Sequence, residues 1–221
     1  MPAGHSNTEA SERTTAKAVP RRKTRPRAVF TRREIADIAG VSLNAVDKAI
    51  EQGVLTRRRL GKETVIETDG LVTIALLREA NVELPVKTKQ LVKRWIAEKQ
   101  PYAAKGDQTL ELSDALMVRV TDLVRNLVAE AERYALDRDR FIESNPHVLG
   151  GQPVITGTCI PVGMIAKRLE DGDTIDVLRE DYPHVDPRAF EVAARYAKTH
   201  PRRGRPAKPW LDGRGRRTSR A

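Results

Sequence analysis

Residues 31–55, "TRREIADIAGVSLNAVDKAIEQGVL", contain the start and stop signals of two short helices. Thr31 is followed three residues later by Glu34, which is the spacing of a capping box, so we expect a helix to begin there. Gly40 ends that helix, because glycine readily adopts the left-handed conformation that a tight turn between helices requires. Ser42 is a good N-cap for a second helix. The stretch therefore predicts two helices joined by a tight turn.

The second of these helices is amphipathic. Val46, Ala49 and Ile50 recur on one face, which we expect to be buried. The spacing, with small Ala36 and Gly40 at the turn, resembles the helix-turn-helix motif of DNA-binding proteins. An asparagine on the outer face of such a helix can read adenine bidentately. The alternative is an ordinary helical hairpin. The resemblance implies that the groove-facing residues are Ser42, Leu43, Asn44, Asp47 and Lys48.

The next stretch, "VLTRRRLGKETVIET" at residues 54–68, contains two β-prone runs around a Gly61-Lys62 turn. It resembles the wing of the winged helix-turn-helix regulators related to excisionases and mercury-resistance regulators, whose basic wing holds DNA phosphates. We expect a DNA-binding domain over residues 29–100, in which the basic face of a helix after Pro85 lies either on phosphates or in solvent. The resemblance assigns phosphate contacts to Arg57, Arg58, Arg59 and Lys62.

Residues 101–140 are expected to form a linker and one long amphipathic helix. From Leu112 to Tyr134, apolar residues recur at steps of three or four, which is close to a heptad pattern. Such a helix can pair with its copy in a homodimer, which suits a palindromic operator, or it can pack on its own domains. The residues expected at the dimer seam are Leu112, Leu116, Val120, Leu123 and Leu127.

Residues 141–200 are expected to form a small β-hairpin followed by three short helices. The segment "GGQPVITGTCIPV", residues 150–162, lacks the Gly-Lys-Ser/Thr end of a nucleotide-binding loop, and its glycines and prolines are better explained as turn residues. Cys159 has no basic partner nearby in sequence, so we expect a buried structural thiol. The segment is therefore interpreted as scaffold.

The same segment, together with "DYPHVDPRAFEVAARYA" at residues 181–197, closely resembles a small helix-turn-helix-like domain of bacterial type II toxin–antitoxin systems. It occurs in VapB-class antitoxins, whose toxins are PIN-like VapC ribonucleases. The similarity extends from about Phe141 to Trp210. The family commonly has a basic residue where this chain has Cys159. The resemblance implies an antitoxin that represses its own operon and silences a ribonuclease.

The two ends of the chain are basic, and we expect both the arm at residues 1–28 and the tail at residues 201–221 to be disordered. The tail carries eight Lys/Arg and one Asp. An arginine-rich tail can pair with the metal-binding carboxylates of a PIN-like toxin, or remain in solvent, or bind the minor groove through its AT-hook-like sequence Arg203-Gly204-Arg205-Pro206. We favour the toxin contact, through Arg202, Arg203, Arg205 and Trp210.

The composition narrows the function classes. A single cysteine cannot form an internal disulfide, and no CxxC pair is present to hold zinc. No carboxylate pair, metal cluster or catalytic triad stands out, so we expect neither an enzyme nor a bound cofactor. No apolar run is long enough to cross a membrane, which favours a cytoplasmic protein. The sequence thus predicts a mainly α fold and an antitoxin-repressor, with a stand-alone dimeric transcriptional regulator as the alternative.

Overall fold

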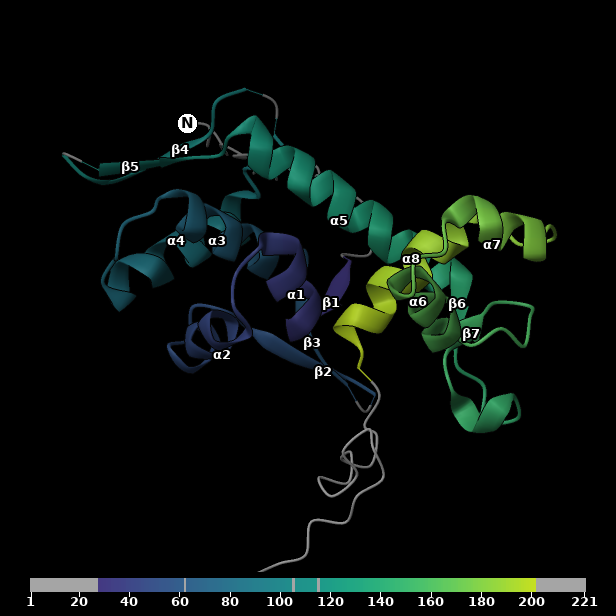
Figure 1. The fold of residues 1–221 in the computed structure, drawn as a ribbon. Helices are drawn as coiled ribbons and strands as arrows, with labels where there is room; N and C mark the ends of the chain where they lie inside the picture. The colour runs from purple at the N-terminus through teal and green to yellow at the C-terminus, as the bar shows by residue number, and fades with distance from the viewer. Residues whose placement is uncertain (1–27, 62, 105, 115, 202–221) are drawn as a thin grey trace, which may run out of the picture.

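The computed structural model describes residues 28–61, 63–104, 106–114 and 116–201. Within these ranges the chain forms eight α-helices and three small antiparallel sheets (Figure 1). The expected mainly α class is therefore confirmed. The disorder expected of the basic ends concerns residues that lie almost wholly outside the described ranges. No helix of the described chain combines the length and the apolar character needed to cross a membrane.

The first unit contains a three-stranded sheet and four helices. In chain order these are β1 (Val29–Thr31), α1 (Arg32–Ala39), α2 (Leu43–Glu51), β2 (Arg57–Leu60), β3 (Glu63–Glu67), α3 (Thr68–Glu79) and α4 (Val86–Lys99). Strand β3 lies between β1 and β2 and is antiparallel to both. The helices and strands expected over residues 31–68 are thus present at the expected positions.

A close approach between α3 and β3 explains a glycine inside a helix. A Cβ atom at Gly70 would lie 2.3 Å from Cγ2 of Ile66. Ile66 is buried in the main core together with Phe30, Ile35 and Leu71. Gly70 therefore allows α3 to lie directly against the sheet, at the expense of the helix propensity that alanine would supply.

The long helix expected within residues 101–140 is present, but its expected first part, from about Leu112, is wrong. Residues there form a hairpin of β4 (Thr109–Ser113) and β5 (Leu116–Arg119), and helix α5 (Asp122–Phe141) begins only afterwards. The Thr121 hydroxyl caps α5 by accepting the Val124 N–H at 3.4 Å. Steps of four residues fit the two-residue period of a strand as well as a helical turn, because alternate residues of a strand share a face.

The five residues assigned to a dimer seam consequently do not share a helical face. Leu112 lies on β4, Leu116 on β5, and Val120 is buried in the connection before α5. Leu127 is half-buried against both cores, whereas Leu123 is 68% exposed. The apolar face of α5 packs on its own chain, and its buried members include Val124, Val128, Ala131, Tyr134 and Ala135.

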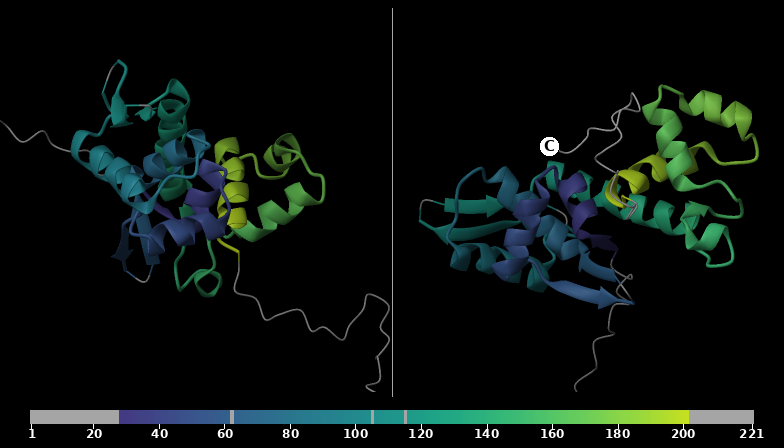
Figure 2. Two further views of the ribbon diagram at one scale, coloured as in Figure 1. Left: turned by 90° about the vertical axis from the view of Figure 1, so that its left-hand side faces the viewer. Right: turned by 60° about the horizontal axis from the view of Figure 1, so that its bottom comes forward.

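The C-terminal unit packs directly on the first. It comprises β6 (Ile142–Glu143), the short 3-10 turn η1 (Leu149–Gly151), β7 (Val154–Ile155), α6 (Val162–Glu170), α7 (Ile175–Asp181) and α8 (Pro187–Thr199). Helix α8 lies beside α1 in both Figure 1 and Figure 2, and it also contacts α5 and α6. Phe190 and Ala193 of α8 belong to the same core as Phe30 and Ile35. The two units therefore share one hydrophobic core.

Candidate nucleic-acid interface

Helix α2 has a capped start and a fully buried inner face. The Ser42 side chain accepts a hydrogen bond from the Ala45 N–H at 3.2 Å, which is the expected N-cap contact. Val46 and Ala49 lie in the main core. Because the inner face is anchored, the opposite face of α2 is held in a fixed direction.

The outer face of α2 presents an amide and an ammonium group. Asn44 and Lys48 are exposed and lie about one turn apart, and Leu43 is half-buried beside them. The carboxylate of Asp47 pairs with the guanidinium of Arg32 at 2.9 Å. This pairing weakens the repulsion that a bare carboxylate would exert on an approaching phosphate.

The turn between α1 and α2 is fixed from α3. Gly40 has a φ of 62°, the left-handed conformation expected from the sequence. The Arg78 guanidinium donates to the Ala39 carbonyl at 2.9 Å and lies 3.1 Å from where a Cβ of Gly40 would be. A larger residue at this position would be strained in its backbone and would displace the guanidinium.

Helix α4 supports the other end of α2. The Gln90 amide donates to the Gln52 carbonyl and the Lys93 ammonium donates to the Gly53 carbonyl, both at 2.8 Å. These groups satisfy carbonyls that the end of a helix leaves without partners. Lys93 therefore has a capping role, whereas Lys87 and Arg94 on the same helix are exposed.

The arginines of strand β2 lie on both faces of the sheet. All of its residues are exposed. Arg57 is directly opposite Ile66 in the strand register, so Arg57 and Arg59 lie on the face that packs against α3. Arg58 lies on the other face, where its guanidinium pairs with the Glu67 carboxylate at 3.1 Å. Arg57 and Arg59 are therefore available to different partners from those of Arg58.

Five residues of the sequence-based site assignment lie outside the described ranges, so the structure does not place them. They are Lys62 and the tail residues Arg202, Arg203, Arg205 and Trp210.

Helix α1 is attached to α5 by a buried ion pair. The Glu34 side chain is 0% exposed, and it accepts hydrogen bonds from Arg138 Nη1 at 2.9 Å and 3.1 Å and from the Tyr134 hydroxyl at 3.1 Å. The Thr31 N–H donates to the same carboxylate at 2.7 Å, which completes the capping box. Burial opposes the charge of Arg138, but the neighbouring carboxylates of Glu34 and Asp139 together outweigh this effect and raise the pKa of the guanidinium.

Helix α1 is also attached to α8. The Asp37 carboxylate pairs with Arg195 at 3.1 Å and with Lys198 at 2.6 Å. The Arg195 guanidinium lies 4.9 Å from the centre of the Tyr134 ring, within the range of a cation–π contact. Helix α1 is thus held by ionic groups from both α5 and α8.

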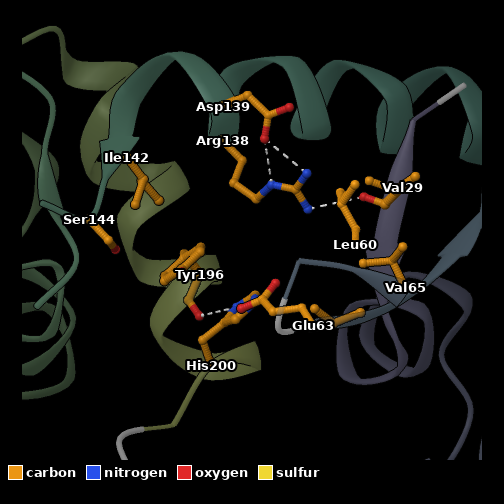
Figure 3. Close-up of a pocket in the computed structure, with 11 residues that line it drawn as sticks. Val29, Leu60, Glu63, Val65, Arg138, Asp139, Ile142, Ser144, Tyr196 and His200 are labelled. Carbon is orange, nitrogen blue, oxygen red and sulfur yellow. Dashed lines mark hydrogen bonds and ion pairs between the residues drawn. The ribbon is translucent and has the colours of Figure 1, made fainter. Parts of the chain in front are cut away.

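A cleft of about 270 Å³ separates the outer face of the sheet from the ends of α5 and α8 (Figure 3). We call the β2–β3 hairpin the wing, as a name only, and this cavity the wing cleft. Leu60 and Glu63 line it on either side of the β2–β3 turn, and Tyr196 and His200 line it from α8. Figure 3 shows His200 close to Glu63, so the end of α8 lies beside the wing.

Residues 150–162 form a scaffold of short turns. The Gly157 N–H donates to the Glu143 carboxylate at 3.2 Å, and the Thr158 hydroxyl donates to the Ile155 carbonyl at 2.8 Å. Cys159 is exposed, so the buried position expected for it is wrong. It lies at the outside of the loop that connects Ile155 to its backbone partner Ile160. Among the described residues no group of three or more His, Cys, Asp or Glu side chains is arranged to hold a metal ion.

Comparison with known proteins gives partial matches. Residues 142–197 match a family described as "Protein of unknown function (DUF433)". The "Uncharacterized protein y4eO" of Sinorhizobium fredii is 36% identical over 64 residues, which is 29% of this chain and 29% of that protein. A crystal structure of Rv2018 from Mycobacterium tuberculosis aligns with 74% of this chain and 95% of its own, with 14% identity and a TM-score of 0.33. The C-terminal unit is thus similar to the DUF433 family.

Proposed function

We propose that this protein is a DNA-binding repressor whose reading element is a winged helix-turn-helix built from β1–β3 and α1–α3. Helix α2 would enter the major groove, which is wide enough to admit one helix, and the β2–β3 wing would lie on the flanking phosphates. One observation carries this proposal. Helix α2, on which Asn44 and Lys48 are exposed, lies near strand β2 (Figure 1), and all the residues of β2, including its three arginines, are exposed.

The roles of the exposed residues follow from their chemistry. The Asn44 amide can both donate to and accept from an adenine edge, so it is the best candidate for a base contact. Lys48, Arg57 and Arg59 are cations on exposed positions, which suits phosphates. Ser42 contributes by capping α2, and Asp47 by its pairing with Arg32.

We further propose that the C-terminal unit makes the protein an antitoxin. The support is the resemblance of residues 150–162 and 181–197 to VapB-class antitoxins. In this account residues 141–200 form the partner-binding module, Arg202, Arg203, Arg205 and Trp210 contact a PIN-like VapC ribonuclease, and a homodimer represses the operon that encodes both proteins. Because α8 holds α1 through Asp37, a partner bound to the C-terminal unit would lie close to the reading element.

Co-expression with the product of the adjacent gene tests the antitoxin proposal. We expect the two proteins to co-purify and the ribonuclease activity of the partner to disappear in the complex. An Asn44→Ala variant is the matched control, because it should retain the partner and lose base discrimination. Absence of any complex, with operator binding intact, would instead support the stand-alone regulator.

A further inference from the structure

A groove of about 480 Å³ lies between α2, the end of α3 and the start of α4. Ala45, Lys48 and Gln52 line it at steps of three and four residues, which places them on one face of the chain around α2. Lys89 lines it from α4. We call it the α2–α4 groove. Its volume lies within the range of about 300–1,000 Å³ that is typical of small-molecule sites.

The floor of the groove is the outer side of the main core. Ala49, Val54 and Ile74 line the groove, and each is no more than 8% exposed. All three belong to the main core. Leu77, which also lines the groove, is half-buried, and Val82 is 56% exposed. A ligand with an apolar part would therefore remove apolar surface from water by covering these side chains.

The walls of the groove are fixed by hydrogen bonds of the protein itself. Gln90 and Lys93 of α4 donate to the carbonyls of Gln52 and Gly53, both at 2.8 Å. Asn81 follows α3 with a φ of 46°, the left-handed conformation that turns the chain at the end of a helix. The groove is thus largely preformed, as small-molecule sites usually are.

The groove has an excess of positive charge. The cations that line it are Lys48, Arg78 and Lys89, and the carboxylate belongs to Glu83. Among the described residues none of these three cations pairs with a carboxylate, and the Arg78 guanidinium donates to the Ala39 carbonyl. An anionic group is therefore the complement of this groove, and the apolar floor is the complement of a hydrocarbon chain.

We propose that the α2–α4 groove binds a small amphipathic carboxylate, whose apolar part lies on the floor and whose carboxylate lies beside Lys48 and Lys89, and that this ligand weakens DNA binding. The effect on DNA rests on the proposed DNA-binding function, whereas the ligand site does not. Lys48 links the two, because it lines the groove and is also one of the cations that we assign to phosphates. A carboxylate beside it lowers the positive charge that α2 offers to DNA.

A DNA phosphate is the competing anion for these cations. The floor favours the carboxylate ligand, because a hydrocarbon chain gains by covering Leu77 and Val82, whereas a phosphate does not. The two anions therefore predict a different dependence of binding on the length of the hydrocarbon chain.

Isothermal titration calorimetry of the full chain with octanoate tests the site in the absence of DNA. We expect binding that weakens about threefold for each methylene removed, as in hexanoate. It should weaken at least about tenfold when 1-octanol replaces octanoate, because the charge is lost. Lys89→Gln should weaken octanoate binding about fivefold. Lys87→Gln is the matched control, because Lys87 is an exposed cation of the same helix that does not line the groove.

Three results would overturn the proposed site. They are the absence of octanoate binding, equal binding of octanoate and 1-octanol, and equal effects of Lys89→Gln and Lys87→Gln. Displacement of octanoate by an equal concentration of inorganic phosphate would also contradict it, since the cations would then belong to a phosphate.

The effect on DNA is measured by fluorescence anisotropy on a duplex selected by the wild-type protein. Saturating octanoate should weaken DNA binding at least about fivefold, the lower end of typical coupling between two sites. Unchanged DNA affinity would overturn the regulatory part of the proposal. A chain that binds octanoate but no duplex would contradict the proposed function and support the ligand site.

Discussion

Arg138 of α5 and Glu34 of α1 form an ion pair in which one guanidinium nitrogen lies 2.9 Å and 3.1 Å from the two carboxylate oxygens. The Glu34 side chain is fully buried, and 104 residues separate the partners in the sequence. The pair joins α1, which precedes α2, to α5, which leads into the C-terminal unit. We therefore expect it to control both stability and the orientation of α1.

Removal of Arg138 should be costly. Arg138→Ala leaves the Glu34 carboxylate buried without its cation, and breaking such a pair typically costs about 3–5 kcal/mol. Urea unfolding followed by circular dichroism measures the change. Arg133→Ala is the control, because Arg133 is exposed on the same helix and should change stability by no more than about 0.5 kcal/mol. Equal effects of the two substitutions would show that the pair is energetically unimportant.

The two faces of the wing should differ in DNA binding. Arg59→Ala removes a cation from the face toward α3, and we expect weaker binding to every duplex and a salt slope reduced by about one. Arg58→Ala should have a smaller effect, because Arg58 is paired with Glu67 on the opposite face. A salt titration of both variants decides the point. A larger loss for Arg58→Ala would place the DNA on the wing-cleft side of the sheet.

Tyr134 should make stability depend on alkaline pH. Burial first, and then the Glu34 carboxylate, raise the pKa of Tyr134 above its ordinary value of 10.0. The folded protein therefore keeps a proton that the unfolded chain releases, so the contribution of Tyr134 is constant below about pH 10 and is lost as the pH rises further. Tyr134→Phe should lose less stability than the wild type between about pH 9 and about pH 11. Parallel losses in the two proteins would contradict the assignment.

If α5 contributes to the proposed homodimer, Leu123 is the residue of the assigned seam that can contact the partner. Of the five residues assigned to the seam, Leu123 is the one left exposed on α5. Leu123→Asp should convert the dimer to a monomer by light scattering and change the free energy of unfolding by no more than about 0.5 kcal/mol. Leu127→Asp is the contrasting variant, because Leu127 packs on both cores and its change should destabilise the fold. An unchanged mass for Leu123→Asp would remove the assigned seam from the interface.

The parts of the fold that could be predicted from the sequence are those set by local chemistry. Thr31 and Glu34 form the expected capping box, Gly40 has the expected left-handed turn, and Asp186 caps α8 just before Pro187. Each of these depends on residues within a few positions of one another. Short-range hydrogen bonds and allowed backbone angles decide them, so the sequence contains the necessary information.

Two kinds of feature could not be predicted from the sequence. In one, the apolar pattern fits a strand and a helix equally well, and in the other, the contacting residues are far apart in the sequence. The alternation of Leu110 and Leu112 with polar neighbours marks a strand, but their steps to Leu116 and Val120 also fit a helix. The Thr121 cap was the local signal that separated the two. The contacts of Glu34 with Arg138 and of Asp37 with Arg195 join residues more than a hundred positions apart. Nothing local in the sequence pairs these residues, because they meet only when α5 and α8 pack on α1.

Selection of bound duplexes from a randomised pool tests most directly whether α2 reads DNA, as we propose. We predict that the wild-type protein enriches one motif, and that Asn44→Ala loses the preference at one or two positions, since a bidentate base contact is worth about 1–3 kcal/mol. Arg133→Ala, which changes an exposed residue of α5 away from α2 and the wing, should recover the wild-type motif. A pool without any enriched motif, or a motif that survives both Asn44→Ala and Lys48→Ala unchanged, would contradict the claim.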